Sequence, residues 1–317
     1  MFGSNRTRQL LALSLLCLFG LSTSALAFQD QQKGKKDKAT ADGTPVLWTD
    51  PGDIATRDLF LGPGGDAMQP DLSSVTYLKD ETGGYSTKYR VRDGAGREWV
   101  VKIGKEAQPE TAVTRLVWAV GYQTDITYLV PHVEIQGKGA FDNVRFEARP
   151  EAVKRLDEWK WEDNPFVGSK ELQGLKILMV LVNNWDLKNS NNRILLSTDE
   201  QTGRKELRYI VSDLGATFGK TGNFITHNRN QPKDYVKTGF IERIDGKRVR
   251  FDYHGKSGDL LRNISVEDAR WIGELLSRLS DQQLKDAFRA ANYSAEEGQL
   301  LADSVRERIN ELVNLPK

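Results

Sequence analysis

Two hydrophobic patterns follow one another along the chain. Between residues 73 and 103, apolar and polar residues alternate in three short runs separated by ETGGYS and by a turn at residues 94–96. Such alternation predicts three antiparallel strands. The run ETAVTRLVWAVGY then repeats apolar residues at helical spacing and ends at Gly121, which predicts a helix opening after Pro109. Two further strand-like runs, DITYLVPHVEI and NVRFEAR, complete a strand-rich first half.

The second half begins with the run KELQGLKILMVLVNN, whose nearly continuous apolar content is typical of a buried helix. It continues directly into the polar stretch WDLKNSNN. The runs NRILL and ELRYIVSD, joined by a loop that contains Thr202 and Gly203, predict a hairpin. Beyond Gly215 a stretch of about 40 residues shows little periodicity. It contains one candidate hairpin, between Phe240 and Tyr253.

Amphipathic helices end the chain, the first capped by Ser265 and the second by Ser280 or Asp281. The order of strands, buried helix, polar loop, hairpin and helices predicts an α+β fold with two lobes and a cleft between them. We expect a β-rich N-lobe over residues 47–150 and a mostly helical C-lobe over residues 151–317.

The first residues have the pattern of a secretory signal peptide. Arg6 and Arg8 precede an apolar run over residues 10–21, and Ala25-Leu26-Ala27 forms an A-x-A cleavage site. An uncleaved membrane anchor is the alternative, but the run is shorter than the roughly 20 residues that span a bilayer. We therefore expect cleavage after residue 27, export to the periplasm or the medium, and no stable membrane anchor. Residues 28–46 are polar and lysine-rich, which predicts a disordered linker.

Composition excludes some classes of site and partner. Cys17 is the one cysteine and lies in the signal peptide, so the mature chain can form neither disulfides nor cysteine-based zinc sites. Loss of Arg6 and Arg8 leaves 43 Lys and Arg against 44 Asp and Glu, a net charge of about −1. This balance does not indicate a nucleic-acid partner.

Two polar motifs flank the predicted hairpin. Asp186-Leu-Lys188-Asn-Ser-Asn191 follows the buried helix, and Asp213-Leu-Gly215 ends the second strand. Phosphoryl transfer needs a carboxylate at the attacking hydroxyl, a cation near the transferred phosphate and oxygen ligands for Mg²⁺. Each motif alone is also typical of an ordinary turn. Their order around one hairpin favours a shared site.

The two motifs resemble the catalytic loop H-R-D-x-K-x-x-N and the D-F-G of protein kinases. Asn184 and Trp185 stand in place of His and Arg, Leu214 in place of Phe, and no Ala-Pro-Glu follows. In these departures the chain resembles atypical branches of the protein-kinase-like superfamily. These branches are the HipA-type bacterial toxin kinases, the phosphatidylinositol 3- and 4-kinases and the secretory-pathway casein kinases. The run VVKIGKEAQPETAVTRLVWAVGY resembles a group of exported kinase-like bacterial proteins.

The resemblance implies further roles. Lys102, in VVKI, matches the lysine that binds the nucleotide phosphates, with Glu110 as its partner and Glu106 as the alternative. Gly83, Gly84 and Ser86 stand where kinases place a glycine-rich loop over the phosphates, although two glycines between strands also indicate a simple hairpin turn.

For the two motifs, the resemblance implies that Asp186 is the base and that Lys188 stabilises transferred charge. Asn191 and Asp213 are the implied metal ligands.

The resulting hypothesis is an exported phosphotransferase that uses ATP or GTP with Mg²⁺. Its acceptor, a protein, a lipid or a small molecule, is left open by the sequence. Two alternatives remain at this point: a secreted pseudokinase that acts as a binding module, and a kinase-like enzyme that transfers AMP.

Overall fold

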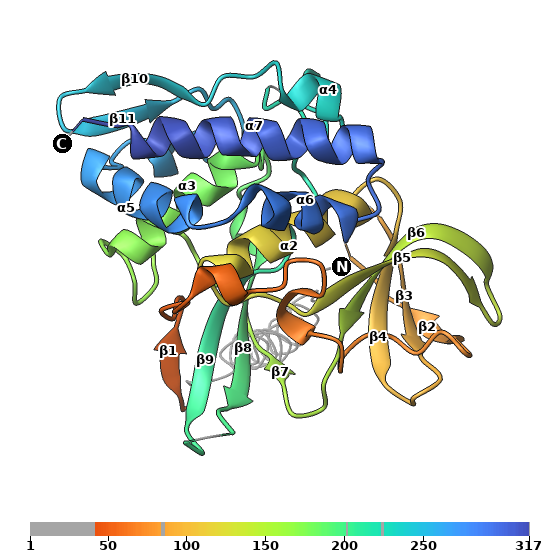
Figure 1. The fold of residues 1–317 in the computed structure, drawn as a ribbon. Helices are drawn as coiled ribbons and strands as arrows, with labels where there is room; N and C mark the ends of the chain where they lie inside the picture. Colours follow the sequence, from red (N-terminus) through yellow and green to blue (C-terminus); the bar gives the residue numbers. More distant parts are fainter. Residues whose placement is uncertain (1–41, 84–85, 201, 223–224, 317) are drawn as a thin grey trace, which may run out of the picture. The chain divides into compact units, whose positions relative to one another are not determined.

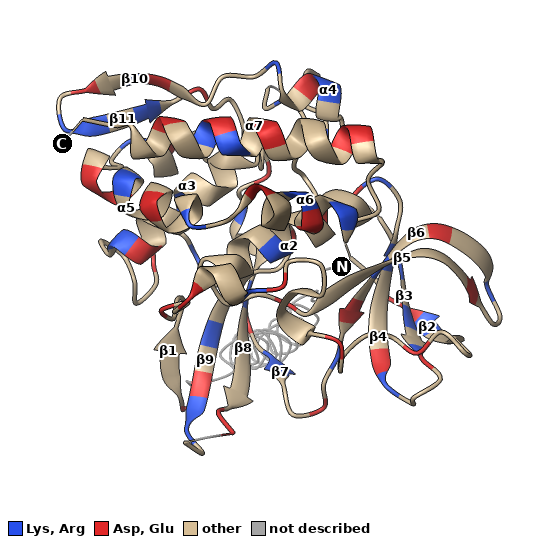
Figure 2. Cartoon of the chain, viewed as in Figure 1, with Lys and Arg blue, Asp and Glu red and all other residues tan. Residues whose placement is uncertain are grey.

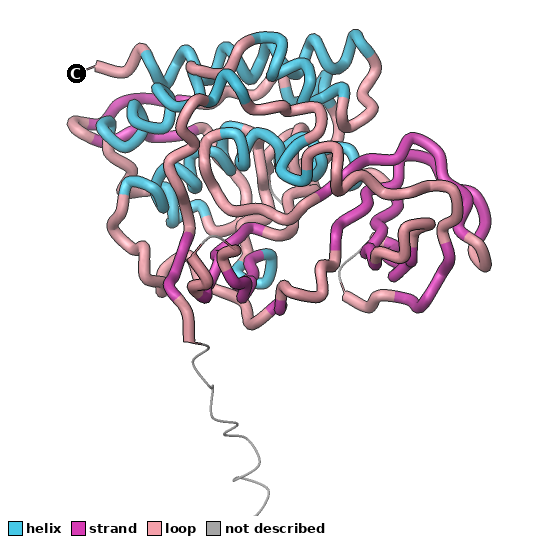
Figure 3. The backbone as a smooth tube through the Cα atoms, turned by 60° about the horizontal axis from the view of Figure 1, so that its bottom comes forward, coloured by secondary structure: helices cyan, strands magenta, loops and turns pink. Residues whose placement is uncertain are grey.

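The computed structural model describes residues 42–83, 86–200, 202–222 and 225–316. The predicted signal peptide, and the predicted linker as far as residue 41, lie outside the described residues. From Gly43 on the chain forms one compact unit. Its elements form a strand-rich part and a mostly helical part, in keeping with the predicted α+β fold, with strands β2 to β6 to one side of the helices (Figure 1, Figure 3).

The strands of the described residues are β1 (Thr44–Val46), β2 (Thr76–Asp80), β3 (Thr87–Arg92), β4 (Glu98–Ile103), β5 (Thr127–Ile135), β6 (Gly139–Ala148), β7 (Lys154–Arg155), β8 (Asn192–Thr198), β9 (Lys205–Val211), β10 (Ile241–Asp245) and β11 (Arg248–Phe251). The α-helices are α2 (Ala107–Ala119), α3 (Lys170–Leu181), α4 (Pro232–Tyr235), α5 (Val266–Ser277), α6 (Asp281–Arg289) and α7 (Ala295–Val313). Short 3₁₀ turns are η1 (Ile54–Thr56), η2 (Gly62–Gly64), η3 (Asn189–Asn191) and η4 (Gly258–Leu261).

The N-lobe sheet is antiparallel, with the strand order β2-β3-β4-β6-β5. The three strands predicted between residues 73 and 103 are present, and the alternation along β4 sets the two faces of the sheet. Trp99 and Val101 are buried in one apolar cluster, which also contains Phe146 of β6. Lys102 therefore points to the opposite face, as the alternation predicts.

Helix α2 joins the two parts of the fold. Its apolar residues Val113, Leu116 and Val117 belong to the large core of the helical part, not to the core of the N-lobe sheet. Figure 1 shows α2 beside α6, and the two helices are in contact. The helix ends near Gly121, whose φ of +99° is a conformation that side chains rarely adopt.

A second sheet has the order β1-β9-β8-β7 and contains the predicted hairpin of β8 and β9. Strand β1 pairs parallel with β9, so Thr44–Val46 belong to the folded part. The linker predicted for residues 28–46 is therefore wrong at its last three residues. They form a strand because β9 offers an unpaired edge, which the linker's own composition cannot reveal. Buried Leu47 follows directly.

The C-terminal helices are capped as predicted. Ser265 accepts a hydrogen bond from the Asp268 N–H, and Ser280 forms a reciprocal capping box with Gln283, so Ser280 and not Asp281 is the cap of α6. Acidic and basic residues occur together along α7, in keeping with the balanced charge (Figure 2). Among the helices described, none combines the length and the apolar content that crossing a bilayer requires.

Candidate functional site

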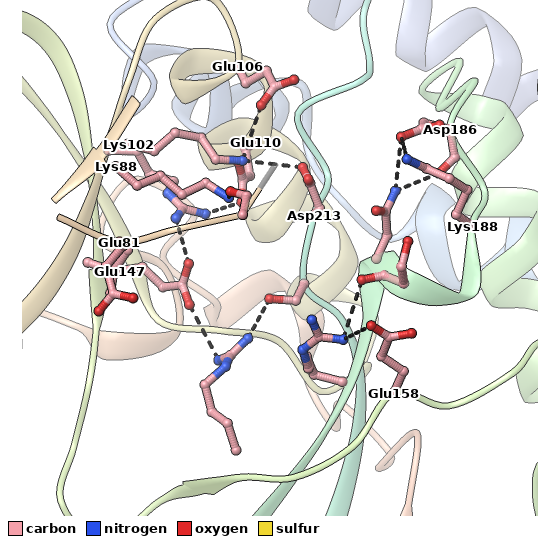
Figure 4. A pocket seen from close by; sticks show the side chains of 18 of the residues that line it. Glu81, Lys88, Lys102, Glu106, Glu110, Glu147, Glu158, Asp186, Lys188 and Asp213 are labelled. Carbon is pink, nitrogen blue, oxygen red and sulfur yellow. Dashed lines mark hydrogen bonds and ion pairs between the residues drawn. The ribbon is translucent and has the colours of Figure 1, made fainter. Parts of the chain in front are cut away.

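A pocket of about 610 Å³ lies between the open face of the N-lobe sheet and the loops around the β8–β9 hairpin. Lys102 and Glu110 line it on one side, and Asp186, Asn191 and Asp213 line it on the other. Figure 4 shows the side chains of Lys102, Glu110 and Asp213 close together, with Asp186 across from them. The structure thus brings together residues that are up to 111 positions apart in the sequence.

Lys102 is the centre of an ion-pair network. Its ammonium nitrogen Nζ lies 2.6 Å from Glu110 Oε2, 3.3 Å from Glu106 Oε2 and 3.3 Å from Asp213 Oδ1. The two glutamates are one helical turn apart at the start of α2 and therefore face the same side. Glu110, the predicted partner, makes the shortest contact, and the alternative Glu106 also contacts Lys102. The lysine side chain is only 2% exposed, which strengthens these contacts.

Arg145 and Glu147 of β6 extend this network and were not predicted. Arg145 pairs with Glu110 and, at 2.5 Å, with Glu147. Glu147 also contacts Arg149 and lies 3.3 Å from Arg155. Burial alone would raise the pKa of Glu147, but the three guanidinium groups outweigh it and hold that pKa well below the ordinary value. The alternation along β6 predicts that Arg145 and Glu147 point to the same face of the sheet. The sequence does not show that β6 pairs with β4, which brings these residues to Lys102.

Asp213 follows β9 and is held at its backbone and its side chain. Its N–H donates to the Asn191 carbonyl oxygen, and its Oδ1 accepts from the Gly215 N–H at 3.4 Å. Burial raises the pKa of Asp213, yet the positive charges of Lys102 and Lys88 prevail and lower it. Gly215 allows a close approach to α2, because an added Cβ would lie 2.6 Å from Glu106 Cβ.

The loop after α3 holds Asp186 between two lysines. Lys188 Nζ lies 2.9 Å from Asp186 Oδ2, and Lys256 Nζ lies 2.7 Å from Oδ1. Burial of Asp186 raises its pKa, but the hydrogen bonds from Lys256 and Lys188 outweigh that effect, so the carboxyl is ionised well below neutral pH. Asn184, which stands where protein kinases have His, fixes the loop by accepting a hydrogen bond from the Asp186 N–H.

Asn191 and Asp213 suit a hard divalent cation. The Asn191 side-chain nitrogen donates to the Asp186 carbonyl oxygen at 2.6 Å, which leaves its Oδ1 as an acceptor. A carboxylate and an amide oxygen are the donors that Mg²⁺ or Mn²⁺ prefers beside phosphate oxygens. Within the described residues, no group of three or more His, Cys, Asp and Glu could hold a metal without such additional ligands.

The loop after Asp213 closes one side of the pocket and was also missed. Arg229 pairs with Glu106 and stacks over the Trp185 ring, with its guanidinium carbon 4.9 Å from the ring centroid. The Trp185 indole N–H donates to the Asn228 carbonyl oxygen at 2.9 Å. Because this loop lacks periodicity, its contact with α2 has no signal in the sequence.

The predicted glycine-rich loop is only partly described. Gly83 lines the pocket with a φ of +110°, and Gly84 lies outside the described residues. Ser86 donates a hydrogen bond to Glu106 at 2.7 Å and lines a neighbouring pocket instead. The structure therefore brings Gly83, but not Ser86, to the pocket that holds the two motifs.

No protein-family model and no curated protein sequence matches the chain. Among solved structures, the proinflammatory kinase CtkA of Helicobacter pylori is similar to it, with 12% identity and a TM-score of 0.51 over 77% of this chain and 94% of that one. A Golgi casein kinase with Mn and ADP bound shows 8% identity and a TM-score of 0.39 over 78% and 74% of the two chains. The Rio2 kinase of Chaetomium thermophilum shows 12% identity and a TM-score of 0.32 over 77% and 74%.

Proposed function

Because the chain has the two-lobed fold of the atypical protein-kinase-like superfamily, we propose that it is an exported phosphotransferase that uses a nucleotide and a divalent metal. A functional assignment rests on the chemistry and geometry of the site and not on the fold alone. The observation that carries this one is the meeting of Lys102, Glu110 and Asp213 at a pocket that also contains Asp186 and Asn191.

In the proposed reaction, the acceptor hydroxyl oxygen attacks the terminal phosphorus of ATP or GTP. A new phosphorus–oxygen bond forms, the bond to the nucleoside diphosphate breaks, and the diphosphate leaves. Asp186 is ionised at neutral pH, so its carboxylate accepts a hydrogen bond from the hydroxyl, orients it and takes its proton as the bond forms. Lys188 stabilises negative charge on the transferred group.

The other side of the pocket positions the donor. Lys102, fixed by Glu110, binds the phosphates as a buried cation that needs no reorganisation. Asn191 and Asp213 would hold Mg²⁺ through their side-chain oxygens. The metal, when bound, neutralises phosphate charge.

Binding of Mg-ATP and Mg-GTP, measured by thermal shift and calorimetry, tests the nucleotide part. A ligand at 100 times its dissociation constant adds about 2.7 kcal/mol to stability, which is readily detected. We expect Lys102→Met and Asp213→Asn to lose this stabilisation. Lys138→Met is the matched control, because Lys138 pairs with Asp80 outside the pocket. Nucleotide binding by both pocket variants at parental affinity would exclude the proposed site.

The transfer step is tested with Asp186→Asn, which keeps the shape and loses the base. We expect nucleotide affinity to be retained and turnover to fall by about 10²- to 10⁴-fold. Mass spectrometry of protein, lipid and small-molecule acceptors distinguishes a gain of phosphate from a gain of AMP. If the parent and Asp186→Asn both bind nucleotide and neither transfers any group, the enzyme hypothesis would be rejected in favour of a pseudokinase.

A further inference from the structure

Three cations stand side by side on the pocket face of the N-lobe sheet. Lys88 of β3 is directly opposite Lys102 of β4, and Lys102 is directly opposite Arg145 of β6. Residues opposite one another on neighbouring strands point to the same face, and like charges in these positions repel. The row is stable only if anions neutralise it.

Two of the three cations have carboxylate partners within the protein. Glu110 contacts both Lys102 and Arg145, whereas Lys88 Nζ contacts the Gly83 carbonyl oxygen at 3.3 Å. Among the described residues, no carboxylate oxygen lies within 4.0 Å of Lys88 Nζ. Figure 4 shows Lys88 next to Lys102, and both line the pocket. Burial and the neighbouring Lys102 lower the pKa of Lys88, as expected for a cation that lacks a close anion. An anionic ligand in the pocket would supply this partner for Lys88.

The end of the pocket beyond Arg145 is filled by ion pairs. In Figure 4, Glu147 lies below Lys88 and Lys102, and Glu158 lies below Asp213 and Lys188. Glu147 is bound by the arginines described above, and Arg155 also contacts Asp125 at 2.5 Å. Arg193 pairs with Glu158 at 3.1 Å. The charged groups at this end are already satisfied by one another.

This end also offers little apolar surface. Of the 23 described residues that line the pocket, Val100 and Trp185 are the ones with an apolar side chain. Trp185 adjoins Asp186, and Val100 is only 4% exposed. Small-molecule sites are usually lined by hydrophobic and aromatic side chains that bury most of the ligand. A base placed within this pocket would meet ion pairs. The apolar pocket that adjoins it at Arg149 and Arg155 has a volume of only about 80 Å³, which is too small to enclose a base.

We infer that this pocket holds its nucleotide mainly through the polyphosphate, with Lys88 as a second phosphate-binding lysine beside Lys102, and that it distinguishes weakly between bases. The inference rests on the proposed function. It names the part of the ligand that is recognised, and it adds a binding residue that the kinase-like motifs do not contain.

Calorimetry of the purified chain with five probes tests it: Mg-ATP, Mg-GTP, Mg-UTP, Mg-tripolyphosphate and adenosine. We expect the three nucleotides to bind within about threefold of one another and tripolyphosphate within about tenfold, with no binding of adenosine. Lys88→Met should weaken all four anionic probes by about tenfold. Lys79→Met is the control, since Lys79 lies on neighbouring β2, is exposed and does not line the pocket.

The outcomes separate this inference from the proposed function. ATP binding more than tenfold tighter than GTP, UTP and tripolyphosphate would overturn base tolerance and leave the phosphotransferase proposal standing. Parental affinity of Lys88→Met for tripolyphosphate would overturn the role of Lys88. If none of the nucleotides binds, both proposals fail together.

Discussion

Lys256 provides a sharp test of the electrostatics around Asp186. It is separated from Asp186 by 70 positions, yet its Nζ lies 2.7 Å from Asp186 Oδ1. The substitution Lys256→Met removes this charge and keeps most of the side-chain length. Because the ammonium stabilises the ionised carboxyl, its loss should raise the pKa of Asp186 toward the ordinary value. Lys188 remains on the other oxygen, so the rise should be partial.

The free energy lost in Lys256→Met depends on how far the side chains of Asp186 and Lys256 are exposed to solvent. A hydrogen bond to a charged group contributes about 1.5–3 kcal/mol net. The Asp186 side chain is 14% exposed, but that of Lys256 is 52% exposed, so solvent screening reduces the contact to about 1 kcal/mol. If Lys256 also supports charge in the transition state, turnover should fall about fivefold.

The direct assay is a carbon-13 NMR titration of the aspartate carboxyls, with Asp186→Asn to assign the signal. The titration midpoint of Asp186 should move to higher pH in Lys256→Met and remain in place in Lys256→Arg. Lys220→Met is the matched control, because Lys220 pairs with Asp234 at 3.3 Å, has a similar exposure of 45% and does not line the pocket. An unchanged Asp186 midpoint in Lys256→Met would refute the reasoning.

Two further predictions concern export and acid stability. The chain expressed in a Gram-negative host should lose about 27 residues and leave the cytoplasm, and an intact N-terminus on exported protein would exclude cleavage. Glu147→Gln should lower the free energy of unfolding by roughly 1.5–3 kcal/mol at pH 7, because it removes one of the two carboxylates that buried Arg145 contacts and leaves Glu110 as the other. Since the pKa of Glu147 is lowered by folding, its stabilisation is present above about pH 4.3 and is lost as the pH falls through its folded pKa. Urea titrations should therefore show a weaker acid dependence in the variant, and equal slopes would contradict the assignment.

Local sequence patterns were sufficient to predict the orientation of side chains that a single strand or helix positions. The alternation of β4 predicts that Lys102 leaves the apolar face, and helical spacing predicts that Glu110 faces inward, since neither depends on distant contacts. The motifs at Asp186 and Asp213 flank a hairpin whose short loop ensures that its two ends lie together. This geometry brings Asn191 to the Asp213 N–H, as the motif order implies.

Residues that depend on tertiary packing could not be predicted in this way. The segment that carries Lys256 has no periodicity, and contacts with the Asp186 loop fix it. The Tyr253 hydroxyl donates to the Asn184 carbonyl oxygen at 2.9 Å, and the Lys256 N–H donates to the Trp185 carbonyl oxygen. Gly255 adjoins this loop, because an added Cβ would lie 2.7 Å from Trp185 Cα. These contacts exist only after the chain between the two segments has folded.

The position of α2 explains why Lys102 has several carboxylate partners. The helix packs Val113 and Leu116 into the core of the helical part, while Glu106 and Glu110, at its start, reach the cation row of the N-lobe sheet. Apolar packing thus fixes α2 to one lobe, and ion pairs fix it to the other. The Lys102–Glu110 pair lies where these two attachments meet, so a displacement of either lobe changes the distance between its charged atoms. The buried pair is therefore sensitive to the arrangement of the lobes. If Lys102 binds phosphate as proposed, such a ligand favours the arrangement in which the pair is intact.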